Sequence, residues 1–163
     1  MAYGLEIIIF YILGQTHALV PEIFGAKPLL ILPILVMIAI FEGELTAFCF
    51  GIFAGVLLDV SFSWQLGFYT IISPVFGYLI GLASRNSAKS TIVYTIYVST
   101  VTLFSIYSLH FFVHFIIGGY SEKLYAYFYH YLPNFLYTLA TCPIFYYINR
   151  AFAAIISEEN QPT

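Results

Sequence analysis

Few side chains in this sequence could carry out acid–base chemistry, and the most informative of them is Asp59, the single aspartate of the protein. It lies at the end of the nearly uncharged apolar run of residues 45–60. An ionised carboxylate in hydrocarbon is costly and needs a partner or water. A proton or ion relay would need a second intramembrane acid on the same path, and the sequence has none that completes one. We therefore predict that Asp59 hydrogen-bonds to another helix or another chain.

Histidine is a second residue type here that could bind a metal or transfer a proton. His110 and His114 have the i, i+4 spacing of metal ligands on a helix, but neither a His-Glu-x-x-His pattern nor a third ligand accompanies them. The sequence therefore predicts no metal site and no cofactor. We interpret His110, His114 and His130 as an outer polar rim that faces the membrane interface, a helix partner or an outward pocket.

Sequence patterns of enzymes are missing from the chain. It has neither the Gly-x-x-x-x-Gly-Lys pattern of nucleotide-binding loops nor the Gly-x-Ser-x-Gly pattern of serine hydrolases. The five Lys and Arg residues are scattered, so the basic patch of a nucleic-acid-binding protein is missing too. We predict that the protein is not an enzyme and binds no nucleic acid.

The composition is that of an integral membrane protein. Hydrophobic residues make up 61% of the 163 residues, charged residues make up 8%, and the mean hydropathy is +0.93. In soluble domains about a quarter of the residues are charged. The apolar residues come in long blocks, which favours membrane-spanning helices. We predict an all-α bundle of about six transmembrane helices that forms a single domain over residues 1–163.

Six helices must position these residues, and they are predicted at 3–20, 29–41, 45–60, 67–84, 91–117 and 133–147. Residues 29–41 and 45–60 are both shorter than the usual span of about 17 to 25 residues. Fusing them would place Glu42 and Glu44 inside the membrane, where charged side chains are costly. We therefore predict a tight hairpin of two short helices with these glutamates at its tip.

Two connections indicate how the bundle lies in the membrane. Residues 85–89 form the most basic short loop, and the positive-inside rule makes this loop cytoplasmic. With six spans, both chain termini are then expected to be cytoplasmic as well. Residues 120–131 are rich in tyrosine, which suits the headgroup layer, and are predicted to form an interfacial helix on the outer face.

Small residues mark the faces on which the helices are expected to pack. Gly51 and Gly55 form one small-xxx-small step and Gly77 and Gly81 form another, and such steps let two helix backbones approach closely. Gly67 begins the next apolar segment, which carries the second step. The fifth predicted helix carries a face of small hydroxyl residues at Thr91, Thr95, Ser99, Thr102 and Ser105. Together these features favour an assembly joint over a transport pathway.

Four short motifs lie between the first predicted helix and the start of the fourth. They are Gln15-Thr16, the turn Gly25-x-x-Pro28, the stretch Gly51-Ile-Phe-Ala-Gly55-Val-Leu-Leu-Asp59, and Leu66-Gly67. In these motifs, in its length and in its six-span layout, the chain resembles the bacterial rod shape-determining protein MreD family. The residues that we predict to pack helices or contact a partner are therefore Gln15, Pro28, Gly51, Gly55, Asp59, Gly67, Gly77 and Gly81.

The resemblance implies a non-enzymatic subunit of the cell-elongation machinery in the bacterial cytoplasmic membrane, working with the single-span protein MreC. The MreB filament, the RodA glycosyltransferase and a class B penicillin-binding transpeptidase are the further partners that it implies. The implied fold is similar to that of the substrate-binding S components of energy-coupling-factor vitamin transporters, so a transporter subunit is the alternative function. S components couple through small alanine-rich steps on their first helix, and the bulky residues 7–13 here are unsuited to such docking.

Overall fold

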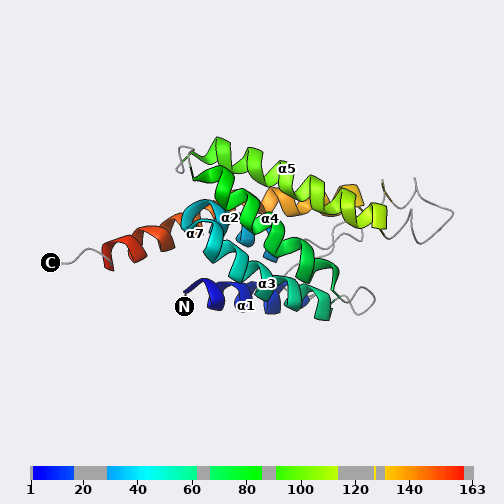
Figure 1. Ribbon diagram of the computed structural model, residues 1–163, viewed down its shortest axis with the longest axis horizontal. Coiled ribbons are helices and arrows are strands. Elements are labelled where there is room, and N and C mark those ends of the chain that lie inside the picture. The colour runs from blue at the N-terminus through cyan, green and yellow to red at the C-terminus, as the bar shows by residue number, and fades with distance from the viewer. Residues whose placement is uncertain are drawn as a thin grey trace.

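The computed structural model describes residues 2–16, 29–61, 67–85, 91–113, 127 and 131–159. These residues form a bundle of six helices and contain no strand, which confirms the all-helical prediction (Figure 1). The helices are α1 (Ala2–Gln15), α2 (Ile31–Glu42), α3 (Glu44–Ser61), α4 (Phe68–Ser84), α5 (Ile92–Phe111) and α7 (Leu132–Glu159). The start of α1 and the end of α7 lie toward the same end of the bundle (Figure 1).

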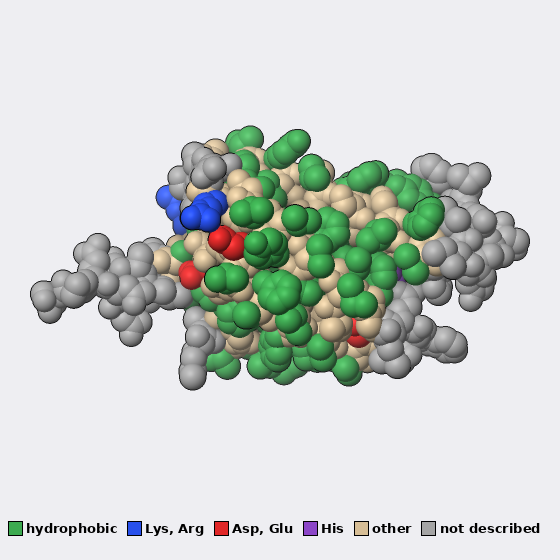
Figure 2. Space-filling view, viewed as in Figure 1, with side chains coloured by type: hydrophobic (Ala, Val, Ile, Leu, Met, Phe, Trp, Pro, Cys, Tyr) green, Lys and Arg blue, Asp and Glu red, His purple; other side chains and the backbone are tan. Residues whose placement is uncertain are grey.

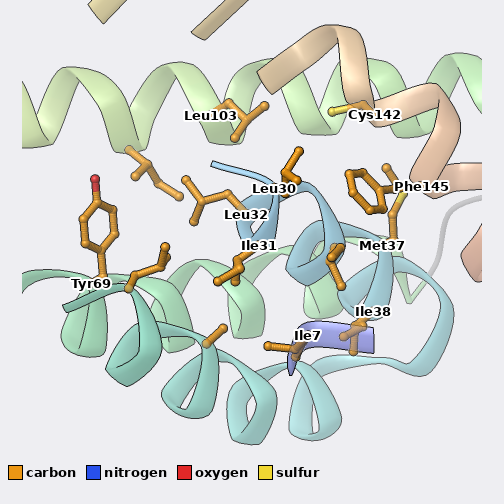
Figure 3. Close-up of a cluster of buried hydrophobic side chains, with 14 of the residues drawn as sticks. Ile7, Leu30, Ile31, Leu32, Met37, Ile38, Tyr69, Leu103, Cys142 and Phe145 are labelled. Carbon is orange, nitrogen blue, oxygen red and sulfur yellow. The ribbon is translucent and has the colours of Figure 1, made fainter. Parts of the chain in front are cut away.

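Helix α2 is the centre of the bundle. All ten of its residues from Ile31 to Ile40 are buried, and the helix packs against each of the other five described helices. A helix that is apolar on every side is stable only where neighbouring helices or lipid surround it completely. Its side chains meet Ile7 of α1, Tyr69 of α4 and Phe145 of α7 in the main hydrophobic cluster (Figure 3). The other helices therefore pack around α2 and separate it from the surroundings.

A single residue separates α2 from α3. Gly43 has a φ of +93°, a left-handed backbone conformation that glycine adopts at little cost. The two glutamates beside it are both engaged, because Glu42 accepts a 2.7 Å hydrogen bond from the Tyr3 hydroxyl and Glu44 lies 3.7 Å from the Arg85 guanidinium. The predicted hairpin of two separate short helices is thus present, with its glutamates at the tip.

The outer wall of the bundle is apolar. Helix α3 exposes Leu45, Ile52 and Val60, and α5 exposes Val93 and Val101. Figure 2 shows hydrophobic side chains spread along this wall, while the lysine and arginine side chains in view gather at one end. Helices α3 and α5 are long and apolar enough to cross a membrane, whereas α1, α2 and α4 are shorter apolar helices. An apolar surface of this extent is suited to contact with lipid.

The last helix is longer than the sequence predicted. The prediction ended it at residue 147, just before the polar residues Asn149 and Arg150, but α7 continues to Glu159. The Asn149 side chain is completely buried and donates a 3.2 Å hydrogen bond to the Phe145 carbonyl one turn earlier. An amide that is bonded within its own helix and to a neighbouring helix does not have to reach water. The interfacial helix predicted at residues 120–131 lies almost entirely outside the described residues.

Candidate functional site

Helices α3 and α4 pack against each other more extensively than any other pair of described helices. They run antiparallel, so that Gly51 of α3 faces Pro74 of α4 and Gly77 of α4 faces Ala47 of α3. The two glycine steps and Asp59 lie on this pair of helices, and Gly67 immediately precedes α4. We define the α3–α4 crossing as the candidate functional site.

The four glycines of the crossing are in direct contact with the backbone of the opposite helix. A Cβ atom added to Gly51 would lie 2.6 Å from Pro74 Cα, and one added to Gly55 would lie 2.6 Å from Thr70 Cα. On the other helix, a Cβ on Gly77 would lie 2.8 Å from the Ala47 carbonyl oxygen.

At the fourth position, a Cβ on Gly81 would lie 2.5 Å from the backbone nitrogen of Glu44. At all four glycines, the added Cβ would lie closer to another atom than real Cβ atoms essentially ever do, and the obstructing atoms are backbone. The absence of side chains at these positions is therefore what allows the two helices to pack at this distance.

Asp59 binds the first turn of α4 with both carboxylate oxygens. Oδ1 accepts a 3.0 Å hydrogen bond from the Tyr69 amide, while Oδ2 accepts hydrogen bonds from the amides of Gly67 at 3.1 Å and Thr70 at 2.8 Å. The Thr70 hydroxyl donates a fourth hydrogen bond, 2.5 Å long, to Oδ2. The side chain is 4% exposed. Asp59 therefore caps α4 from the preceding helix.

This cap explains why a buried carboxylate is tolerated here. The first amides of a helix have no partner within the helix, and the helix dipole favours negative charge at that end. Gly67 is the residue before α4, has a φ of +99° and carries no side chain that could cap the helix. Asp59 supplies the missing oxygen atoms. With four donors already bound, its carboxylate serves structure and is not disposed for base catalysis.

Gln15 joins α1 to the same end of α3. Its Nε2 donates a 2.5 Å hydrogen bond to the Ser61 hydroxyl, which in turn donates to the Leu57 carbonyl at 3.0 Å. Ser61 lies two residues after Asp59, so the amide of the Gln15-Thr16 motif reaches the end of the Asp59 helix. Pro28, which the sequence also singled out, lies outside the described residues.

His110 packs in an aromatic cluster at the Asp59 end of the bundle. Its Nδ1 is 2.8 Å from the Tyr131 hydroxyl, and its ring stacks on Tyr69 with centroids 5.7 Å apart and planes 24° apart. His114 and His130 lie outside the described residues. Within the described ranges, no three His, Cys, Asp or Glu side chains come together as a metal site would require.

Beside this cluster, Thr138 forms a hydrogen-bonded hub that the sequence did not predict. The Thr138 hydroxyl of α7 accepts a 3.1 Å hydrogen bond from the amide of Leu29, donates to the Asn134 carbonyl at 2.7 Å, and lies 3.1 Å from the Tyr107 hydroxyl. It therefore links the start of α2, the end of α5 and the first turns of α7. Threonine gives no distinctive sequence signal among apolar residues, because it packs helices in many places.

A shallow pocket opens between α5 and α7 near this hub. Its lining is mainly aromatic and consists of Phe104, Tyr107, Ser108, Tyr127, Tyr131, Leu132 and Phe135. Its empty volume of about 230 Å³ includes the open mouth. Among the described residues, the pocket is thus an open aromatic hollow between α5 and α7.

The described residues form an apolar wall, a central buried helix and a helix crossing built from glycines and one fully hydrogen-bonded carboxylate. These features define a helical membrane protein whose site is structural. The chain belongs to the MreD family, because the sequence model of the family, described as rod shape-determining protein MreD, matches residues 2–155. This family is one of shape-determining structural proteins, and its role is rod-shape determination. No curated protein and no solved structure matched the chain. The similarity to transporter S components therefore stays a prediction.

Proposed function

We propose that this chain is a non-enzymatic integral membrane subunit of the bacterial rod-shape machinery that binds MreC and helps to link the MreB filament to peptidoglycan synthesis. RodA and a class B penicillin-binding transpeptidase are the synthetic enzymes that this proposal places nearby. The observation that carries it is the agreement of the family match with the local geometry. The motif from Gly51 to Asp59, together with Gly67, consists of residues that hold α3 against α4.

The crossing supports the proposal by making a rigid platform. The glycine faces of α3 and α4 are already in contact with each other, so they do not contact MreC directly. A partner helix instead meets an outward apolar face or one end of the bundle, where association in lipid relies on close packing. The motif residues accordingly act as positioning residues, because they hold the outward faces of α3 and α4 in a fixed relation.

The charge distribution supports an orientation for this platform. Arg85 lies at the end of the bundle that also holds Glu44 and the start of α1, since Tyr3 binds Glu42 there. The end of α7 is near as well, because the rings of Tyr3 and Phe152 are in contact. Under the positive-inside rule, this end is cytoplasmic and both termini face the cytoplasm. The Asp59 end then faces outward.

Co-purification from native membranes tests the proposal. A tagged copy of the chain, expressed at its natural level and extracted in mild detergent, should retain MreC, with RodA and the transpeptidase in smaller amounts. A tagged multi-span membrane protein of unrelated function serves as the control for nonspecific association. Recovery of coupling ATPase subunits with a bound vitamin, in place of MreC, would contradict the proposal and favour the transporter alternative.

A further inference from the structure

Polar side chains attach α1 to the rest of the bundle. Its outward face is apolar and exposed at Leu5, Ile9 and Ile12. In contrast, the Glu6 side chain is 4% exposed and Asn149 of α7 is completely buried. The Asn149 Nδ2 atom donates a 2.8 Å hydrogen bond to Glu6 Oε1, so the first described helix is joined to the last.

The orientation of the Asn149 amide is settled by its second contact. Nδ2 also lies 3.2 Å from the carbonyl oxygen of Phe145. A carbonyl oxygen only accepts hydrogen bonds, so the amide atom next to it must be the nitrogen. Both hydrogen atoms of Nδ2 are thereby used, one for the Phe145 carbonyl and one for Glu6. The Asn149 Oδ1 atom must find a donor elsewhere.

Two oxygen atoms of this pair have no hydrogen-bond partner. Glu6 Oε2 and Asn149 Oδ1 are both buried and unpaired among the described residues. An ionised Glu6 would offer only acceptors, and two buried acceptors without a donor are costly. The nearby titratable groups give no relief, because the Tyr3 hydroxyl binds Glu42 and Arg150, the residue after Asn149, is exposed.

We propose that Glu6 is a neutral carboxylic acid in the folded protein and that its Oε2–H donates to Asn149 Oδ1, closing a reciprocal acid–amide pair between α1 and α7. One proton taken from water turns Oε2 from an unpaired acceptor into a donor and satisfies Oδ1 in the same step. The two hydrogen bonds then run in opposite directions between two planar groups. The pair fastens the first helix to the last and makes that attachment depend on a proton.

Substitution of Glu6 by glutamine separates the proton from the shape of the side chain. In Glu6→Gln the amide replaces the protonated carboxyl, with its oxygen as acceptor and its nitrogen as donor to Asn149 Oδ1. We expect this variant to keep the Tm of the native protein in detergent, measured by tryptophan or tyrosine fluorescence. Glu6→Ala removes both bonds and leaves Asn149 unpaired, which should lower Tm by roughly 3 to 10 °C.

The pH dependence gives a second readout. The folded state holds a proton that the unfolded chain already loses above about pH 4.3, the ordinary pKa of glutamate. The stability of the native protein should therefore fall as pH rises above this value, until the folded state loses the proton as well. The Tm of Glu6→Gln should not show the part of this fall with pH that comes from the Glu6 proton. Equal pH profiles for the native protein and Glu6→Gln, or a Tm of Glu6→Gln as low as that of Glu6→Ala, would overturn the proposal.

Infrared spectroscopy tests the protonation state directly, without reference to stability. The native protein at neutral pH should show a carbonyl band of a protonated carboxyl group that shifts in heavy water and is lost in Glu6→Gln. Glu42→Gln is the matched control, because Glu42 already has a donor in Tyr3 and the band should persist in that variant. If the native and Glu6→Gln spectra coincide in this region, Glu6 is ionised and the proposal fails.

Discussion

Asp59 Oδ2 accepts two hydrogen bonds from one residue, Thr70, from its amide at 2.8 Å and from its hydroxyl at 2.5 Å. The two residues lie on consecutive helices, and the glycine contacts bring the backbones of those helices together at the same place. A Cβ on Gly55 would meet Thr70 Cα at 2.6 Å. The polar cap and the close packing therefore reinforce each other. A change that separates the helices also breaks the cap.

Asp59→Asn should destabilise the protein by about 2 kcal/mol or more. The amide can keep one acceptor oxygen, but in either orientation its nitrogen, a donor, must face donors that now bind the carboxylate. Thermal unfolding in detergent measures the loss, and cell shape on replacement of the native gene measures the consequence. Glu44→Gln is the control, since its ion pair with Arg85 is partly exposed and should contribute about 1 kcal/mol at most. Unchanged stability and cell shape in Asp59→Asn would make the carboxylate incidental.

Gly55→Ala and Gly14→Ala should change stability in opposite directions. A Cβ on Gly55 would meet the backbone of Tyr69 and Thr70, so the helices must separate, and we expect a loss of at least about 2 kcal/mol. No atom of the described residues lies within 4 Å of a Cβ added to Gly14, and alanine favours a helix over glycine by about 1 kcal/mol. Chemical or thermal unfolding of the two variants compares them directly. A tolerated alanine at Gly55 would contradict the close crossing.

The same pair of glycines tests the proposed function. If the rigid α3–α4 crossing positions the surface that binds MreC, Gly55→Leu should reduce MreC recovery on co-purification several-fold. Gly14→Leu adds an equally large side chain where there is space and should leave recovery unchanged. Recovery is normalised to folded protein, judged by elution volume. Wild-type recovery of MreC with Gly55→Leu would show that the crossing does not position the binding surface.

Thr138→Val should destabilise the bundle by about 1 to 3 kcal/mol. Valine keeps the shape but removes the hydroxyl that binds the Leu29 amide and lies beside the Tyr107 hydroxyl. Thr100→Val is the matched control, because the bond of the Thr100 hydroxyl among the described residues stays within its own helix, to the Ile96 carbonyl. Its effect should stay within about 0.5 kcal/mol. Equal unfolding temperatures for the two variants would show that the Thr138 hydroxyl does not stabilise the contact between these helices.

Thiol labelling tests the orientation in the membrane. In a background in which Cys49 and Cys142 are replaced by alanine, Arg85→Cys should react with an impermeant maleimide only after the membrane is opened. Thr16→Cys, exposed at the opposite end of the bundle, should react in intact spheroplasts. The reverse pattern would show that the bundle has the opposite orientation.

Much of the architecture follows from the sequence because its signals are local. Long apolar blocks predict helices in lipid, and the cost of burying Glu42 and Glu44 separates α2 from α3 at the right place. The spacing of Gly51 and Gly55 indicated a close crossing, and both residues contact the α4 backbone. The resemblance that these motifs carry is confirmed by the family match over residues 2–155.

Partners distant in the chain were decided by the tertiary structure alone. The sequence shows that Asp59 needs a partner, but only the antiparallel packing of α3 and α4 brings the unpaired amides of the next helix to it. Asn149 looked like a helix end, yet its contact with Glu6, 143 residues away, keeps it inside a longer helix. Hydrogen bonds of this kind depend on which helix faces meet, and side-chain periodicity along one helix does not specify its neighbour.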